Sequence, residues 1–282
     1  MVGIAFGLCS GLMINRLVAE PVDALAKAAR AVAAGRLNQE IRAYRADEFG
    51  LLINEFNDMV AGLRQKARLR ETLGLHVGEK VAGRIMERDP GLSGVEEEIT
   101  VMFVDIRGFT ERTRDLDPAH TVQMLNLFLT HMVEVVETRF GGMVNKFLGD
   151  GFMAIFGIDQ SQGSEGWVAL QAALEMERRL QRVNAELEEL GQAPLSIGMG
   201  LHSGRAVVGS IGSPQRLEFT AIGATVNLAS RIEGLTKSLG EVILFTEEVR
   251  AQLPADFPCR VLAAQTVKGV AQPVPVFAPM RD

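Results

Sequence analysis

Two aspartates stand at chain turns that can meet in the folded protein. Asp105 follows the apolar, β-branched residues 99–104 (ITVMFV), and Asp150 lies in the Gly-Asp-Gly turn of a hairpin predicted over residues 143–156. If the hairpin pairs beside that strand, the two carboxylates face one spot, where charges ~4 Å apart repel by about 4 kcal/mol. Cations between them would offset this repulsion, and oxygen ligands without nearby His or Cys favour Mg²⁺ or Mn²⁺ over zinc. The alternative is that Asp150 only forms the turn.

The segment after Asp105 predicts a turn into a helix. Residues 106–110 (IRGFT) contain Gly108 and lead into a polar helical start. A strand-to-helix turn with glycine presents backbone N–H groups that suit phosphate oxygens. By itself, this pattern is a weak indication of a phosphate site.

A polar pair lies in the helix predicted over residues 225–239. Asn227 and Arg231 are four residues apart and therefore share one helix face. An amide and a guanidinium on one face could position a ribose and hold charge that develops on a phosphoryl group. The alternative, a residue near the helix start plus a solvated arginine, is common.

The elements that position these residues predict an α+β fold, a ferredoxin-like sandwich with an antiparallel sheet. Residues 99–104 are apolar on both faces, as in a buried central strand. The predicted helices span residues 120–140, 165–190 and 225–239. The further predicted strands span residues 195–201, 206–211 and 217–222 and lie near Val242, Val261 and Val274.

The first part of the chain predicts an all-α coiled-coil bundle. Apolar residues follow alternating steps of three and four on both sides of a connector at 36–46: Val22, Leu25, Ala29 and Val32, then Phe49, Leu52, Phe56, Met59 and Leu63. Two such helices make a parallel four-helix bundle when two chains pair.

An uncharged segment precedes these helices. Residues 2–14 would span about 20 Å as a helix, too short for a bilayer core of about 30 Å. Because Arg16 follows, we interpret this segment as the end of a transmembrane helix whose beginning is missing. The alternative is a buried helix of a soluble protein.

The composition is that of a globular protein. The 282 residues are 47% hydrophobic and 23% charged, with a formal net charge of -6. This balance argues against a nucleic-acid-binding surface, which needs clustered Lys and Arg, but it does not exclude an anionic nucleotide. Cys9 and Cys259 have no metal-type spacing, and we expect two reduced thiols.

The N-terminal pattern resembles the HAMP domain, which links transmembrane helices to output domains. The matching residues are Pro21, Gly35, Ile41, residues 47–50 (DEFG) and residues 56–59 (FNDM). The resemblance covers residues 15–65. It implies membrane attachment through residues 1–14, with the HAMP and output domains in the cytoplasm. The charged residues after it predict a helical linker over residues 66–95, with a boundary at 89–91 (DPG).

Three motifs in order resemble the catalytic domain of the class III nucleotide cyclases, over about residues 96–278, which predicts a catalytic domain at residues 96–282. They are residues 103–110 (FVDIRGFT), 146–150 (KFLGD) and 219–231 (FTAIGATVNLASR). The resemblance implies cyclisation of ATP to cyclic AMP in a homodimer, with two Mg²⁺ or Mn²⁺ ions per active site and with ligands from one chain meeting Asn and Arg of the other.

The resemblance also implies a role for each matching residue. Asp105, Asp150 and the backbone carbonyl of Ile106 would hold the metal ions. Asn227 would orient the ribose, and Arg231 would stabilise the transition-state charge. The remaining implied substrate contacts are the turn residues Gly108, Phe109 and Thr110, the base readers Lys146 and Thr220, and the phosphate contacts Arg205 and Lys268.

The choice of base follows from hydrogen bonding. Lys146 only donates, so it suits N1 of adenine and opposes N1–H of guanine. Many adenylate cyclases carry Asp where this chain has Thr220, whose hydroxyl can accept from adenine N6 or donate to guanine O6. Related guanylate cyclases typically carry Glu and Cys at the two positions, so we predict an adenylate cyclase. The Lys-Thr pair also resembles the bicarbonate-responsive branch of the family, from which we hypothesise bicarbonate stimulation.

Two other functions are open to a chain of this kind. A non-catalytic signalling module with the same fold would lose at least one of Asp105, Asp150, Asn227 or Arg231, and all are present. A diguanylate cyclase has a related fold but a Gly-Gly-Asp/Glu-Glu-Phe hairpin, whereas this chain has LGDGF at residues 148–152.

Overall fold

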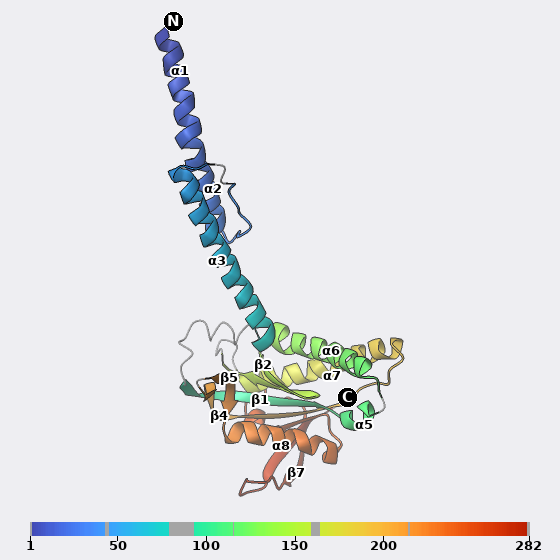
Figure 1. Cartoon of the computed structure of the whole chain (residues 1–282). Helices are drawn as coiled ribbons and strands as arrows, with labels where there is room; N and C mark the ends of the chain where they lie inside the picture. Colours follow the sequence, from blue (N-terminus) through green and yellow to red (C-terminus); the bar gives the residue numbers. More distant parts are fainter. Residues whose placement is uncertain are drawn as a thin grey trace. The chain divides into compact units, whose positions relative to one another are not determined.

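The computed structural model describes residues 2–42, 45–78, 93–114, 116–158, 164–213 and 215–280. The chain divides into two compact units, residues 1–76 and 77–282, which are described separately below. Figure 1 shows their helices and strands. The predicted boundary at residues 89–91 lies outside the described residues.

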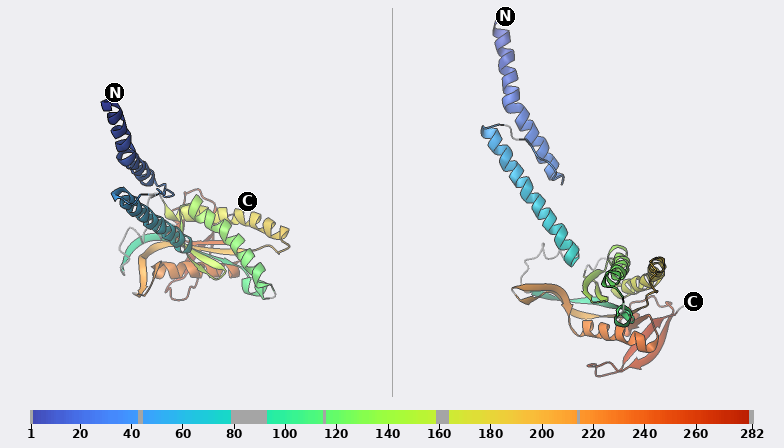
Figure 2. Two further views of the ribbon diagram at one scale, coloured as in Figure 1. Left: turned by 45° about the horizontal axis from the view of Figure 1, so that its top comes forward. Right: turned by 45° about the vertical axis from the view of Figure 1, so that its right-hand side comes forward.

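The N-terminal unit is entirely helical in its regular structure. Helix α1 (Val2–Ile14), a π-helical segment η1 (Asn15–Ala19) and α2 (Glu20–Ala33) follow one another, and α3 (Glu48–Val77) comes after a connector. None of the helices in the described part of the chain combines the length and apolarity needed to cross a bilayer. Helices α2 and α3 run side by side in the same direction (Figures 1 and 2).

Polar contacts fix the connector between these helices. The side chain of Asn57 on α3 accepts from the backbone N–H of Ile41 at 3.1 Å and donates to its carbonyl at 2.8 Å. Arg64 donates to the carbonyls of Leu37 and Gln39. The side chain of Asp47 accepts from the backbone N–H of Gly50 at 3.2 Å near the start of α3, as residues at a helix N-terminus commonly do.

The apolar residues that recur at steps of three and four in α2 and α3 are called the heptad seam here, and they are largely exposed in the single chain. Its members Val22, Leu52, Met59 and Leu63 are 49%, 52%, 50% and 39% exposed. The side chains that are buried within the chain come from neighbouring positions, among them Ala28, Ala31, Ile53 and Val60. Burial of this apolar area against a second surface would stabilise the unit.

The C-terminal unit is built on one mixed sheet, in the order β2-β3-β1-β4-β6-β8-β7, with β5 paired to β4. The pairings are antiparallel except that of β4 with β6. The strands are β1 (Ser93–Ile106), β2 (Met143–Leu148), β3 (Gly151–Phe156), β4 (Ile197–Ser213), β5 (Arg216–Ile222), β6 (Ile243–Thr246), β7 (Cys259–Gln265) and β8 (Val274–Pro279).

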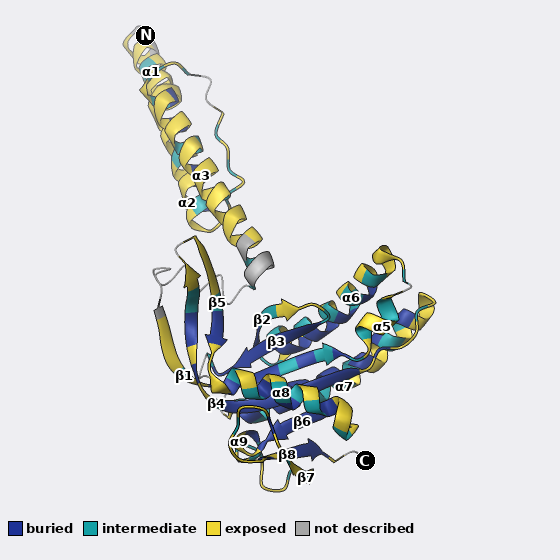
Figure 3. Cartoon of the chain, turned by 60° about the horizontal axis from the view of Figure 1, so that its bottom comes forward, coloured by how far each residue is buried: buried dark blue, intermediate teal, exposed yellow. Residues whose placement is uncertain are grey.

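Helices cover both faces of this sheet (Figures 1 and 3). Helix α6 (Pro118–Val133), continued by the π-helical η2 (Glu134–Arg139), and α7 (Glu165–Glu189) lie on one face, and α8 (Ala224–Leu239) lies on the other. Two short helices, α5 (Phe109–Thr113) and α9 (Glu247–Arg250), complete the described helices of the unit.

The central strand β1 carries a core on each side. Met102, Val104 and Ile106 join the core beneath α6 and α7, whereas Ile99 and Val101 join the one on the opposite face. This alternation follows from the period of two along a strand, and it confirms the prediction of a strand buried on both faces.

Strand β4 corrects one sequence prediction. The sequence predicted separate strands at residues 195–201 and 206–211, but residues 197–213 form a single strand. A Cβ at Gly200 would lie 2.1 Å from the backbone nitrogen of Glu233, so glycine there admits the backbone of α8. The glycines of this strand therefore mark a close backbone approach and not a chain break.

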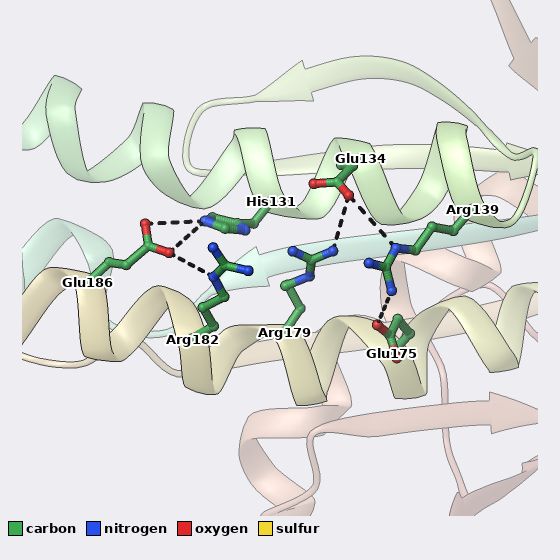
Figure 4. A network of polar contacts seen from close by, with 7 residues as sticks. All are labelled: His131, Glu134, Arg139, Glu175, Arg179, Arg182 and Glu186. Carbon is green, nitrogen blue, oxygen red and sulfur yellow. Dashed lines mark hydrogen bonds and ion pairs between the residues drawn. The ribbon is translucent and has the colours of Figure 1, made fainter.

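Ion pairs join α6 and η2 to α7 on the outer side of the unit (Figure 4). Arg139 pairs with Glu175 at 2.7 Å, Arg179 pairs with Glu134 at 3.1 Å, and His131 approaches Glu186 at 3.4 Å. Most of these side chains are partly exposed, so each pair stabilises the unit by less than about 1 kcal/mol. The network aligns the helices, and the apolar core supplies most of their packing energy.

Candidate active site

The two predicted metal-binding aspartates lie together at one end of β1. Asp150 occupies the turn between β2 and β3, and β3 pairs directly with β1. A Cβ at Gly151 would lie 2.2 Å from the carbonyl oxygen of Val104 and 2.7 Å from Oδ1 of Asp105. Glycine after Asp150 therefore allows the turn to rest on the end of β1.

The contact changes the acidity of Asp105. Burial, together with the charge and hydrogen bond of Asp150, raises the pKa of its carboxyl to about 6. A cation that replaces the proton would therefore stabilise the ionised carboxylate of Asp105. Among the described residues, no three His, Cys, Asp or Glu side chains lie close enough together to hold a metal ion.

A third carboxylate faces this pair, and the sequence analysis missed it. Glu233 of α8 is half-buried, and burial together with the charges of Asp105 and Asp150 raises its pKa to about 7, against an opposing effect of Arg107. Its side chain lies near Gly198 of β4, where a Cβ would be 2.9 Å from Glu233 Oε1. Glu233 follows Arg231 by two residues, and no spacing in the sequence relates it to the two aspartates.

Arg107 fixes the chain just beyond Asp105. Its backbone N–H donates to Ser196 at 2.8 Å, its Nε donates to the carbonyl of Ile197 at 3.1 Å, and its Nη2 donates to the carbonyl of Glu241. These bonds hold the end of β1 to the neighbouring strands. Ile106, whose carbonyl was predicted as a ligand, is 1% exposed and anchored in the core.

The predicted phosphate turn follows directly. Gly108 adopts a left-handed conformation, with φ of 66°, and precedes the short helix α5. Phe109 packs against the core, which fixes the turn next to Asp105. Thr110 lies within α5. The predicted turn into a helix is therefore present.

Asn227 and Arg231 lie on one face of α8, as predicted. Asn227 is exposed and Arg231 is partly exposed. The guanidinium of Arg231 lies against Gly269, where a Cβ would be 3.1 Å from Nη1. The structure therefore brings the exposed Lys268 next to Arg231 in the fold, although the two are far apart in sequence.

The two predicted base readers lie on neighbouring elements. Lys146 of β2 pairs with Glu218 of β5 at 2.7 Å, and Thr220 of β5 donates to Asn145 of β2 at 2.8 Å. Glu218 and Thr220 are two residues apart and share one face of β5. Lys146 and Thr220 therefore lie beside each other.

Arg205 is the predicted site residue that the single chain leaves most isolated. It is a highly exposed residue of β4, and its guanidinium is 3.4 Å from Glu96. Its backbone carbonyl accepts from Thr225 at 2.6 Å, which ties the start of α8 to β4. The described contacts do not connect Arg205 with the aspartate pair.

Comparison with known proteins places this arrangement in a family. The model of the adenylate and guanylate cyclase catalytic domain matches residues 93–277, and the HAMP domain model matches residues 13–65. The chain belongs to the adenylate and guanylate cyclase family. This cyclase carries a HAMP domain at its N-terminus, and both predicted resemblances are confirmed.

Solved structures of two cyclases are similar to the C-terminal unit. The adenylyl cyclase CyaB from P. aeruginosa is 32% identical, with a TM-score of 0.62 over 68% of this chain and 97% of that one. The guanylyl cyclase Cya2 is also 32% identical, with a TM-score of 0.60 over 67% of this chain and 94% of that one. The similarity therefore supports a nucleotidyl cyclase without choosing the nucleotide.

Curated relatives extend the similarity through the HAMP domain. The uncharacterized protein Rv1318c of Mycobacterium tuberculosis is 35% identical over 238 residues, which are 84% of this chain and 42% of the relative. The uncharacterized protein Mb1354c of Mycobacterium bovis is 32% identical over 281 residues, which are 99% of this chain and 48% of the relative. The cyclase spans less than half the length of these relatives.

Proposed function

We propose that this cyclase converts ATP to 3′,5′-cyclic AMP and pyrophosphate at the interface of a homodimer. The observation that carries the proposal is the contact between Asp105 and Asp150, where burial and the charge and hydrogen bond of Asp150 raise the pKa of Asp105. Two carboxylates forced together in a half-buried site are stabilised by divalent cations, and this family acts on nucleoside triphosphates through such ions.

The residues present fit two Mg²⁺ or Mn²⁺ ions. The carboxylates of Asp105 and Asp150 and the backbone carbonyl of Ile106 supply hard oxygen ligands, and the triphosphate and water would supply the rest. Bound there, the ions would lower the pKa of the ribose 3′-hydroxyl and offset the charge of the triphosphate. Glu233 adds negative charge beside the pair, which strengthens the attraction for cations.

The chain's own side chains would position the reacting groups. The 3′-oxygen attacks the α-phosphorus, and the bond from that phosphorus to pyrophosphate breaks. Asn227 orients the ribose, and Arg231 donates to the oxygens on which charge develops. Arg205, Lys268 and the turn at Gly108, Phe109 and Thr110 bind phosphate oxygens.

The geometry of α8 supports a site shared between two chains. Glu233 faces the aspartates of its own chain, and Arg231 is rotated from it by about 200° at ~100° per residue. Arg231 therefore faces away from those aspartates, so it would serve the aspartates of a partner subunit. Exposed apolar side chains on the strands nearby fit such an interface: Val95, Phe147, Val207, Leu217 and Ile222.

Selection of ATP rests on Lys146. Its ammonium donates to N1 of adenine and opposes N1–H of guanine. Its ion pair with Glu218, at 2.7 Å, directs it along β5. Rejection of a mismatched buried donor can reach ~10⁴-fold, although a partly exposed site gives less.

The HAMP domain would regulate the reaction. The exposed seam of α2 and α3 fits pairing of two chains into a four-helix bundle, and two packings of that bundle would change how the catalytic units meet. Apolar side chains of α1, such as Phe6 at 75% and Ile4 at 73% exposed, fit contact with a membrane, with the HAMP and catalytic domains on its cytoplasmic side. Sedimentation with lipid vesicles, with and without residues 1–14, tests the membrane contact.

Product analysis tests the proposed reaction. The purified chain is incubated with ATP or GTP and with Mg²⁺ or Mn²⁺, and cyclic nucleotides are separated by chromatography. We expect cyclic AMP from ATP, little cyclic GMP, and no product after chelation or in Asp105→Asn. Preferential formation of cyclic GMP would overturn the choice of base, and absence of both products would overturn the enzymatic proposal.

A further inference from the structure

An asparagine next to the predicted base readers carries an inference beyond the proposed reaction. Asn145 is the extra residue of an irregularity in β2, where Val144 pairs with Ala154 and Lys146 pairs with Met153. The irregularity turns Asn145 towards β5, where it contacts Phe219 and Thr220. Thr220 is 5% exposed, so its hydroxyl has few ways to rotate towards other partners.

The contacts of Asn145 fix the orientation of its amide. One amide atom lies 2.7 Å from the carbonyl oxygen of Phe219, and a carbonyl only accepts hydrogen bonds. That atom must be the amide nitrogen, because an oxygen there would leave two acceptors facing each other. The amide oxygen of Asn145 therefore faces Thr220.

The orientation of the amide fixes the hydroxyl of Thr220 in turn. The hydroxyl oxygen is 2.8 Å from Oδ1 of Asn145, and an amide oxygen only accepts, so Thr220 must donate its proton. The carbonyl of Ala221 lies 3.5 Å from the same hydroxyl, at the limit of a hydrogen bond, so it competes weakly with the amide oxygen at 2.8 Å. While Asn145 takes the proton, the lone pairs of the hydroxyl oxygen are what Thr220 offers to a ligand.

We infer that Asn145 makes Thr220 an obligate hydrogen-bond acceptor and thereby selects adenine over guanine. The inference rests on the proposed nucleotide site. Adenine presents an acceptor at N1 and a donor at N6, which match the donor Lys146 and the acceptor Thr220. Guanine presents a donor at N1 and an acceptor at O6, so it is mismatched with both. Asn145 is thus a positioning residue, because it fixes whether the threonine hydroxyl donates a hydrogen bond to the base or accepts one from it.

The test compares nucleotide preference with and without the amide. In Asn145→Leu the hydroxyl of Thr220 is free to donate to guanine O6, so we expect the ratio of kcat/KM for ATP to that for GTP to fall about tenfold. The same ratio is measured for dissociation constants, from competition by ATP and GTP against a fluorescent nucleotide. This second readout holds even if the chain binds nucleotide without turnover.

A double-mutant cycle separates positioning from a general structural effect. In Thr220→Val there is no hydroxyl to orient, so adding Asn145→Leu should leave the ATP-to-GTP ratio unchanged. The melting temperature of each variant is recorded to identify unfolded protein, and Asn145→Gln, which keeps both an amide donor for Phe219 and an amide acceptor for Thr220, serves as the folded alternative and should retain the preference for ATP.

The outcomes distinguish the inference from the proposed function. A fall in the ratio for Asn145→Leu alone, absent in the Thr220→Val background, supports the inference. An unchanged ratio in Asn145→Leu, or an equal fall in both backgrounds, overturns it. Absence of cyclic product from wild-type protein, with the binding ratio still dependent on Asn145, would instead count against the proposed reaction.

Discussion

Arg231 and Glu233 stand two residues apart on α8 and face different sides of that helix. Burial and the charges of Asp105 and Asp150 raise the pKa of Glu233, whereas the guanidinium of Arg231 lies against Gly269. Helix α8 therefore directs its carboxylate towards the aspartates of its own chain and its arginine away from them. The proposed active site needs a second chain for this reason.

Replacement of Asp105 should stabilise the protein when no divalent metal ion is present. The pKa of Asp105 is about 6 in the folded chain and near its ordinary value when unfolded, so folding favours the protonated form. The contribution of Asp105 to stability is therefore most favourable below pH ~4 and is lost as pH rises through 6. We expect Asp105→Asn to raise the free energy of unfolding by about 1 kcal/mol at pH 7.5, since solvent screens part of the repulsion.

Thermal unfolding in chelator at pH 4.0 and 7.5 checks this prediction. The gain from Asp105→Asn should shrink at the lower pH, and added Mn²⁺ should stabilise the wild type but not the variant. The exposed Asp256 supplies a matched control, Asp256→Asn, which should show neither effect. A gain that is equal at both pH values would contradict the assigned cause.

Glu233→Gln should affect both stability and metal affinity. The pKa of Glu233 is about 7, so its cost to the folded state appears as pH rises from about 4.5 through 7. We expect the variant to be more stable than the wild type at pH 8 and to bind Mn²⁺ a few-fold more weakly, because one nearby negative charge is gone.

Calorimetric titration with Mn²⁺ at pH 8 measures the second effect. Glu188 of α7 is exposed on the other side of the sheet, so Glu188→Gln is the control and should bind Mn²⁺ as the wild type does. Unchanged affinity for Mn²⁺ in Glu233→Gln would show that this carboxylate does not contribute to the electrostatic attraction of cations to the two aspartates.

Two glycines provide a test of how closely α8 packs on β4. A Cβ at Gly200 would lie 2.1 Å from the backbone nitrogen of Glu233, so Gly200→Ala must displace the helix and should cost about 1–3 kcal/mol. Gly234 of α8 has nothing within 4 Å of an added Cβ, and Gly234→Ala should stabilise by about 0.5–1 kcal/mol. Denaturant unfolding measures both, and a neutral Gly200→Ala would contradict the packing described.

Much of the fold followed from local sequence patterns. The apolar residues around 99–104 predicted β1 as a central strand, and the Gly-Asp-Gly turn predicted the hairpin that carries Asp150. The pairing of the two carboxylates could be predicted because the end of a strand and the turn of a neighbouring hairpin can meet in only a few arrangements. The position of Asn227 and Arg231 on one helix face followed from their spacing of four.

Contacts between distant segments could not be predicted in this way. The break predicted within β4 was wrong, because glycines that admit α8 carry the same local signal as glycines at a turn. Glu233 and Asn145 were missed because neither has a spacing that suggests a role. Each acquires one only when α8 packs on β4, or when β2 and β5 approach.

The central claim is that the aspartates of one subunit act with Asn227 and Arg231 of the other. The most direct test mixes two variants that are each inactive, Asp105→Ala and Arg231→Ala, and measures cyclic AMP formation after the subunits exchange. Random pairing gives half heterodimers with one intact site each, so we predict recovery of about a quarter of wild-type activity. No recovery, with heterodimers demonstrated by differently tagged chains, would contradict the shared active site.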